Sequence, residues 1–193
     1  MRGVHIINKL IEKRRTTREF LRQNLKDGDI RKILEAGRWA PSSLNSQPWK
    51  FIVVKDAKKI NSIIKMCYYG DYNKNPAVLI AVVLDKNCYP SNNLLMKFEK
   101  RFQPNLNYVN IAMPALNMAY QACLMGIDSG IKSPTSQMVN KLLGIPKGYE
   151  CVLIVCLGYK DRISHKIKRG RKPLKDIVYL EKFGCKIKHK QQK

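Results

Sequence analysis

Eight consecutive apolar residues, at positions 77–84, place the strongest constraint on how this 193-residue chain can fold. A strand with one solvated face alternates apolar and polar side chains, whereas a strand covered on both faces is apolar throughout. The run is too short for a membrane span, which needs about 20 apolar residues. We therefore expect a buried strand with other layers of structure on both of its faces.

Helical periodicity surrounds this strand. Apolar residues recur at spacings of three and four in the ranges 4–13, 30–40, 56–67 and 107–125, which predicts four helices. The longest contains Pro114, which removes a backbone donor and should kink it. Together with two further apolar strands, this pattern predicts one α+β or α/β domain without a hairpin meander.

Three local expectations concern where elements begin and end. Asp27 or Asp29 is the expected cap of the second helix. Ser133-Pro134 is the expected start of a helix that ends at Leu143, because proline favours the first helical position. The two further strands are expected at 51–54 and 151–157.

The charge is extreme, and part of it is concentrated at one end. Lys and Arg total 37 against 14 Asp and Glu, a net charge of +23. Such a field attracts nucleic acid, anionic lipid or a phosphorylated cofactor without distinguishing them. The range 160–193 is basic and poor in core residues. We expect one domain over 1–193, with 160–193 as a basic C-terminal arm.

Several classes of protein are disfavoured by what the sequence lacks. Its six cysteines include no C-x-x-C pair and its three histidines are scattered, so we expect no metal site. The N-terminus has no uninterrupted apolar region typical of a secretory signal, and a reducing cytoplasm is the expected location. No P-loop, G-x-G-x-x-G or nucleophile elbow is present, so an enzyme of this sequence would rely on a cofactor.

Two segments offer polar groups suited to ligand binding. Residues 14–18, R-R-T-T-R, place three guanidinium groups and two hydroxyls where they could bind a phosphate, or could form a solvated helix end. Residues 40–49, A-P-S-S-L-N-S-Q-P-W, form a stiff polar loop that suits the edge of a planar heterocycle, or is an ordinary turn. A third segment, 169–173, could bind phosphate or lie in a solvated tail.

In this order the segments resemble the nitroreductase family of flavoproteins. The family has R-R-S/T-x-R/K after its first helix, then A-P-S-x-x-N-x-Q-P-W leading into F-x-V-V. This chain has 14–18, then 40–49 followed by Phe51-Ile-Val-Val54. Further matches are Met125-Gly126-Ile127, Leu143-Gly144-Ile145-Pro146, Leu157-Gly158-Tyr159 and the basic residues 169–173.

The resemblance implies an α+β, nitroreductase-like three-layer fold, with a central, mainly antiparallel sheet flanked by helices. It implies an intertwined homodimer that holds one FMN at each of two subunit interfaces. NADH or NADPH would pass hydride to flavin N5, and a small-molecule electron acceptor such as a nitroaromatic or quinone would then be reduced. No protein nucleophile is required.

The resemblance also implies two groups of FMN contacts. Arg14, Arg15 and Thr16 would hold the phosphate, and Arg18 would stabilise the negative charge that reduction places near the flavin pyrimidine edge. The residues expected from the partner subunit are Pro41, Ser42, Ser43, Asn45 and Gln47. The remaining candidates are Asn73, Ser133 and, from the arm, Arg169 and Arg171.

Other interpretations stay open. The same fold serves dehydrogenases, dehalogenases and flavin-modifying enzymes. Where the family often brings a backbone N–H close to flavin N5, this chain has Ser133-Pro134, and proline has no N–H. A basic nucleic-acid-binding protein is a further alternative. The Lys-rich tail of this chain has little aromatic interleaving, so we expect neither a specific nucleic acid nor a membrane as partner.

Overall fold

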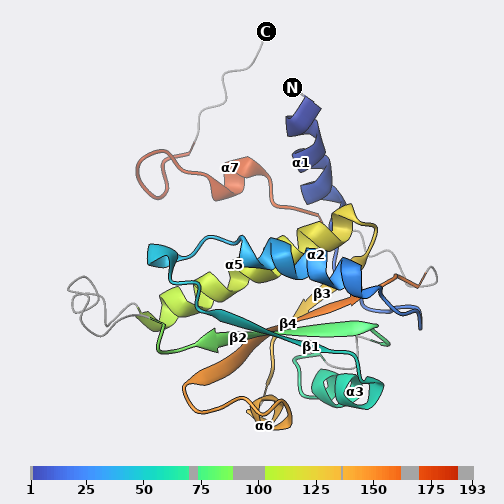
Figure 1. Ribbon diagram of the computed structural model, residues 1–193. Helices are drawn as coiled ribbons and strands as arrows, with labels where there is room; N and C mark the ends of the chain where they lie inside the picture. The colour runs from blue at the N-terminus through green and yellow to red at the C-terminus, as the bar shows by residue number, and fades with distance from the viewer. Residues whose placement is uncertain (1, 70–73, 89–102, 136, 162–169, 187–193) are drawn as a thin grey trace.

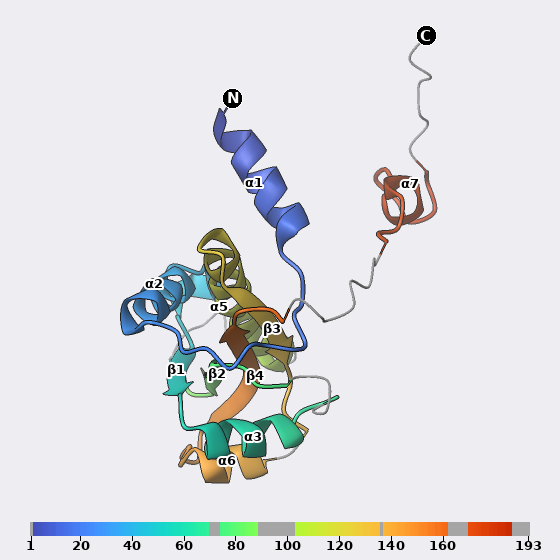
Figure 2. The ribbon, with the colours of Figure 1, turned by 90° about the vertical axis from the view of Figure 1, so that its right-hand side faces the viewer.

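A four-stranded antiparallel sheet lies between two layers of helices (Figure 1). The computed structural model describes residues 2–69, 74–88, 103–135, 137–161 and 170–186. The strand order is β1-β2-β4-β3, formed by β1 (Trp49–Val54), β2 (Val78–Asp85), β4 (Tyr149–Gly158) and β3 (Asp128–Lys132). On one face pack α2 (Asp27–Arg38) and α5 (Gln103–Leu124); on the other lie α3 (Ala57–Lys65) and α6 (Met138–Leu142) (Figures 1 and 2). The expected three-layer, mainly antiparallel fold is confirmed.

Strand β2 supplies both halves of the core. Its residues from Val78 to Leu84 are all buried. Because side chains alternate along a strand, Val78, Ile80, Val82 and Leu84 pack toward α2 and α5. The intervening Leu79, Ala81 and Val83 pack with residues of α3 and α6. The expectation of a strand covered on both faces is therefore confirmed.

Helix α5 fits this arrangement through small and branched residues. Ile111, Ala115, Met118 and Ala122 recur at spacings of four, three and four and are fully buried. The helix continues through Pro114, which is itself buried. Across from it, α2 buries Ile30, Ile33 and Gly37. Helices α2 and α5 therefore form the layer that covers this face of the sheet.

Two sequence expectations are corrected. Helix α2 follows Lys26, so Asp27 and Asp29 lie in its first turn and neither caps it. Ser133-Pro134 opens no helix. Pro134 pairs with Cys67 in an isolated bridge, and the next helix, α6, starts only after Gln137. Backbone pairing with the end of α3 therefore overrides the local preference of Ser-Pro for a helix start.

Strand β3 was not predicted from the sequence. Its sequence, Asp-Ser-Gly-Ile-Lys, contains a single large apolar residue, Ile131, and that residue is exposed. Antiparallel pairing with β4, in which Gly130 lies opposite Cys156, makes it a strand. No alternation in the sequence marks such a segment.

Two segments project from this body with apolar side chains exposed. Helix α1 (Arg2–Lys13) stands away from the sheet, and Ile6, Ile7 and Ile11 are each at least half exposed (Figure 2). The arm containing α7 (Leu174–Ile177) also lies apart from the body. It exposes Leu174, Ile177, Leu180 and Phe183. In the described ranges, no helix combines the length and apolar character required to cross a membrane.

A close backbone approach at the end of β4 yields a stability prediction. A Cβ on Gly158 would lie 2.8 Å from Cδ1 of the buried Phe20 and 3.3 Å from the backbone N of Ala77. We expect Gly158→Ala to lower the free energy of unfolding by about 1–3 kcal/mol through overpacking. Urea unfolding measures it.

Gly28→Ala is the matched control. A Cβ there meets nothing within 4 Å, and the residue lies in the first turn of α2, where alanine favours helix. We expect unchanged or slightly raised stability. Equal losses in the two variants would contradict the packing explanation.

Candidate functional site

The basic segment that follows α1 is docked along β3 in extended conformation. Thr16 and Ser129 form a parallel bridge, and the Thr17 N–H donates to the Ser129 carbonyl at 2.9 Å. Thr17 is buried, and its hydroxyl donates to Asp128 Oδ1 at 3.3 Å. Since side chains alternate along extended backbone, Thr16 and Arg18 face away from the Thr17 side. Pairing with β3 thus buries Thr17 and leaves the side chains of Thr16 and Arg18 on the other side of the segment, at the edge of the sheet.

Further backbone bonds fix the position of Arg18. Its carbonyl accepts from the Lys74 N–H at 2.8 Å, and the Lys74 carbonyl accepts from the Phe20 N–H at 2.9 Å. The Leu21 N–H then donates to the Tyr159 carbonyl at 2.8 Å. The segment is therefore held by three separate parts of the chain. A solvated helix end would need none of these bonds.

The far end of β3 brings Ser133 to the same edge. The Ser133 carbonyl accepts from the Tyr68 N–H at 3.0 Å, and Lys132 Nζ donates to the Tyr69 carbonyl at 2.9 Å. Burial lowers the pKa of Lys132, and the charge of nearby Arg18 acts in the same direction. Arg18 and Lys132 thus create a positive potential beside Ser133. This arrangement suits a ligand group that carries or gains negative charge.

The second predicted segment, the loop 40–49, is rigid and strained. Ser42 Oγ accepts from the Gln47 N–H at 2.9 Å, and Gln47 Nε2 donates to Asn45 Oδ1 at 3.1 Å. Leu44, Asn45 and Gln47 have φ values of 54°, 52° and 45°. Left-handed backbone at non-glycine residues costs on the order of 1 kcal/mol or more each and clusters at functional sites.

Unsatisfied polar atoms on this side of the molecule fit a polar ligand. In the described ranges, Ser46 Oγ and Asn107 Oδ1 are buried side-chain oxygens without a hydrogen-bond partner. Asn110, one turn along α5 from Asn107, accepts the Ser43 N–H at 3.2 Å, so the start of α5 lies against the loop. Buried polar atoms are normally paired. Hydrogen-bonding capacity therefore remains where the loop was expected to meet a heterocycle.

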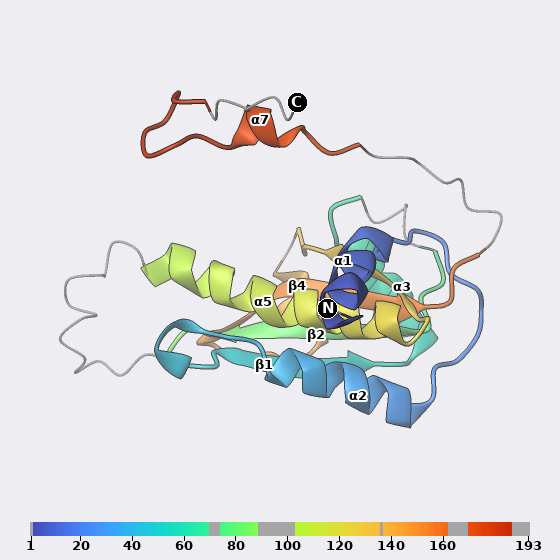
Figure 3. The same cartoon turned by 90° about the horizontal axis from the view of Figure 1, so that it is seen from above.

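The two segments lie at opposite ends of the molecule. The turn η1 (Ser43–Asn45) lies beside the start of α5, whereas the chain leaves α1 near the other end of that helix (Figures 1 and 3). Within one chain, the basic run and the loop 40–49 are therefore separate places.

The sequence-predicted residues are thus distributed over distinct places. Thr16, Arg18 and Ser133 lie at the β3 edge, and Arg14 and Arg15 directly precede Thr16, between α1 and the bridge to Ser129. The loop holds Pro41, Ser42, Ser43, Asn45 and Gln47. Arg171 is exposed shortly before α7, whereas Asn73 and Arg169 lie outside the described residues.

Three residues at the β3 edge were missed: Lys74, Asp128 and Lys132. Lys74 bonds the backbone of Arg18, Asp128 accepts the Thr17 hydroxyl, and Lys132 holds the backbone at Tyr69. Each becomes a neighbour of the basic segment only through strand pairing. Their positions in the sequence carry no signal of it.

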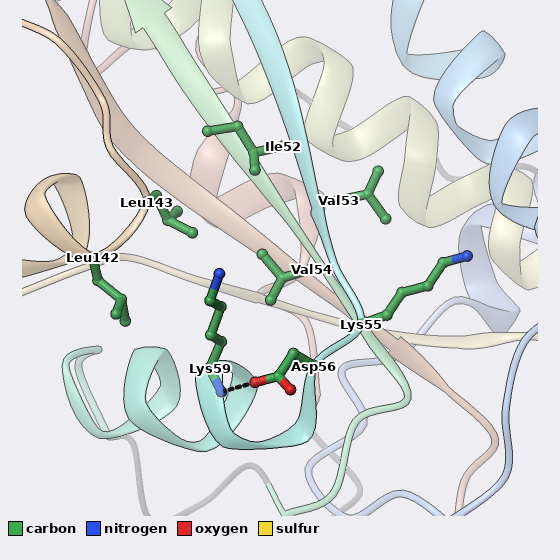
Figure 4. A pocket seen from close by; sticks show the side chains of 8 residues that line it. All are labelled: Ile52, Val53, Val54, Lys55, Asp56, Lys59, Leu142 and Leu143. Carbon is green, nitrogen blue, oxygen red and sulfur yellow. Dashed lines mark hydrogen bonds between the residues drawn. The ribbon is translucent and has the colours of Figure 1, made fainter.

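A pocket of about 240 Å³ lies elsewhere, beside the edge strand β1 (Figure 4). Apolar side chains of β1 and α6 line it together with Lys59, whereas Lys55 points away and pairs with Asp27. Asp56 Oδ1 accepts the Lys59 N–H at 2.8 Å and caps α3. None of the predicted cofactor residues lines this pocket. It is separate from both halves of the candidate site.

Comparison with known proteins identifies the relatives of this arrangement. A model of the nitroreductase family matches residues 11–159. An Archaeoglobus fulgidus protein, provisionally named NADH dehydrogenase/NAD(P)H nitroreductase, is 29% identical over 78% of this chain and 83% of its own. Iodotyrosine deiodinase of Thermotoga neapolitana is 26% identical over 83% of this chain and 92% of its own. The crystal structure of an FMN-dependent nitroreductase from Clostridium difficile superposes with a TM-score of 0.73, at 21% identity, over 90% of this chain and 98% of its own.

Cys67, next to this edge, is predicted to be unreactive. Burial raises the pKa of its thiol to about 11, although Lys132 opposes the shift, and burial raises that of Cys151 to about 12. A raised pKa keeps a thiol neutral, so the nucleophilic thiolate is scarce at pH 8. We expect iodoacetamide to modify exposed Cys185 at least about tenfold faster than Cys67. Peptide mass spectrometry resolves the sites.

Denaturant provides the control for this prediction. In urea, Cys67 and Cys185 should react at similar rates, because burial no longer separates them. Rapid labelling of Cys67 in the folded protein at pH 8 would contradict the assignment.

Proposed function

This chain belongs to the nitroreductase family, and from that premise we propose that it is a homodimeric, FMN-dependent oxidoreductase. The proposed reductant is NADH or NADPH, and the proposed acceptor is an electron-poor small molecule such as a nitroaromatic or a quinone. The observation that carries the proposal is the docking of Thr16–Arg18 along β3, which holds a basic run at the sheet edge. A cytoplasmic location remains a prediction.

The residues of the basic segment suit a flavin phosphate. Arg14 and Arg15 offer planar guanidinium groups whose paired N–H donors match phosphate oxygens, and the exposed Thr16 adds a hydroxyl. Arg18 and Lys132 would favour negative charge at the flavin edge beside Ser133. When bound, FMN would supply the hydride-transfer chemistry. The protein contributes binding, orientation and positive potential.

A second copy is proposed to complete the site. The loop 40–49 and the segment that follows α1 lie at opposite ends of α5 in the same chain (Figure 1). Helix α1 has only 12 residues and exposes three isoleucines, and a short helix is marginal without packing. The arm exposes apolar residues in the same way. Mutual burial of these surfaces would bring each loop to the partner's arginines.

Reductive dehalogenation is the second candidate. The relative from Thermotoga neapolitana is named a deiodinase, and its match spans most of both chains. This chain also has Pro134, without an N–H, beside Ser133. A halogenated phenol therefore belongs among the acceptors tested.

The decisive experiment follows bound flavin through one redox cycle. The protein is purified, reconstituted with FMN and freed of unbound cofactor, and its absorbance near 450 nm is then followed anaerobically. We expect bleaching by NADH or NADPH and recovery on adding a quinone, a nitroaromatic or a halophenol. Failure to retain flavin would end the proposal. Flavin reoxidised by the halophenol alone would favour the second candidate.

The phosphate assignment predicts the effect of removing two arginines. Arg14→Ala combined with Arg171→Ala should weaken FMN binding at least about tenfold, since charge-assisted hydrogen bonds contribute about 1.5–3 kcal/mol each. Quenching of flavin fluorescence measures the Kd. Arg31→Ala combined with Lys32→Ala, on the exposed side of α2, removes equal charge elsewhere and should leave the Kd nearly unchanged. Equal Kd values for all three proteins would show that the phosphate binds elsewhere.

If the site is completed by a second copy, a variant that cannot dimerise should also lose affinity for FMN. Ile7→Lys puts a charge on the exposed apolar face of α1 and should yield monomers in sedimentation equilibrium that bind FMN poorly. Lys9→Gln, on the same helix, should remain dimeric. Monomeric Ile7→Lys with wild-type FMN affinity would show that one copy suffices.

A further inference from the structure

The carboxylate of Asp128 joins two segments that are distant in sequence. Its Oδ1 accepts from the Thr17 hydroxyl at 3.3 Å, and its Oδ2 accepts from the Lys160 N–H at 2.9 Å. Asp128 is the first residue of β3, and Thr17 is buried beside it. Each carboxylate oxygen therefore holds a different segment against the same strand.

The two segments that it joins carry the cationic groups of the candidate site. Thr17 lies between Thr16 and Arg18 of the basic run, and Lys160 begins the C-terminal arm directly after β4. Backbone bonds reinforce the junction, because the Asp161 N–H donates to the Glu19 carbonyl at 3.0 Å. Asp128 supplies a side-chain link between the basic run, β3 and the base of the arm.

The charge of Asp128 makes this position informative. A carboxylate close to an anion-binding segment weakens anion binding by simple repulsion. Removing its charge would therefore strengthen binding if Coulomb attraction alone mattered. Loss of the two hydrogen bonds would instead loosen the segment and weaken binding. The two effects have opposite signs, so a measurement separates them.

We propose that Asp128 is a positioning residue that fixes the basic run 14–18 and the base of the arm for recognition of the flavin phosphate. The proposal rests on the proposed FMN function and deepens it. It assigns cofactor affinity in part to an acidic residue that does not touch the cofactor. It also couples the phosphate-binding segment to the arm that carries Arg171.

The test compares FMN with riboflavin, which lacks the phosphate. Asp128→Asn keeps the shape of the side chain but replaces one acceptor oxygen with an NH2 donor. We expect FMN affinity to fall about tenfold or more, as for loss of a hydrogen bond to a charged group, with riboflavin affinity within about twofold. Fluorescence quenching measures both. A variant that is merely damaged would lose both affinities in parallel.

Thr17 provides a second route to the same bond with the charge of Asp128 intact. Thr17→Val should reduce FMN affinity selectively, and Thr17→Ser, which keeps the hydroxyl, should restore it. The effects of Asp128→Asn and Thr17→Val should be less than additive, because both weaken the same interaction. Asp29→Asn, in the first turn of α2, is the charge-matched control and should change neither affinity.

The outcomes separate this proposal from the one on which it rests. A wild-type protein that binds no flavin overturns the proposed function and, with it, the positioning role of Asp128. A wild-type protein that binds FMN, with unchanged or tighter binding in Asp128→Asn, overturns the positioning role alone. Parallel loss of FMN and riboflavin affinity also overturns it, because it shows general damage.

Discussion

Burial of β2 on both faces is the constraint on which the rest of the structure depends. Alternation along this strand sends Ile80 and Val82 toward α2 and α5, and Leu79 and Ala81 toward α3 and α6. A strand of this kind requires a covering layer on each side and a neighbour on each edge. Strands β1 and β4 supply those neighbours. The center is therefore apolar, and polar chemistry is confined to the edges and loops.

The candidate site follows from this confinement. The β3 edge accepts the extended segment after α1, and the loop 40–49 closes the opposite end of the layer formed by α2 and α5. Neither place alone offers both cations and amide groups. The same chain leaves α1 and the arm with apolar faces uncovered. In the proposed homodimer, a second copy would cover the apolar faces of α1 and the arm. It would also bring its loop to the first copy's arginines.

Strong local periodicity made much of the fold predictable, and strand pairing made the rest unpredictable. A buried strand is predicted by the apolar run 77–84. A buried helix is predicted by the stripe of Ile111, Ala115, Met118 and Ala122. Strand β3 has no such pattern, and Ser133-Pro134 carries a helix-start signal that pairing with Cys67 overrides. In the candidate site, the segments 14–18 and 40–49 could be predicted from their residue types: arginine and threonine in the first, proline and small polar residues in the second. Nothing in the sequence connects Asp128 with Thr17, because a loop closure of 111 residues brings them together.

The scarcity of acidic residues gives Asp128 its significance. Four other carboxylates in the described ranges form ion pairs: Glu150 with Lys86, Glu19 with Lys74, Glu35 with Arg38 and Asp27 with Lys55. Hydrogen bonds from Arg38 and then Trp39 lower the pKa of Glu35 to about 2. In the described part of the chain, Asp128 instead receives a hydroxyl and a backbone N–H and forms no ion pair. Asp128 therefore draws none of the described cations into an ion pair, while its carboxylate orders the backbone on either side of Thr17.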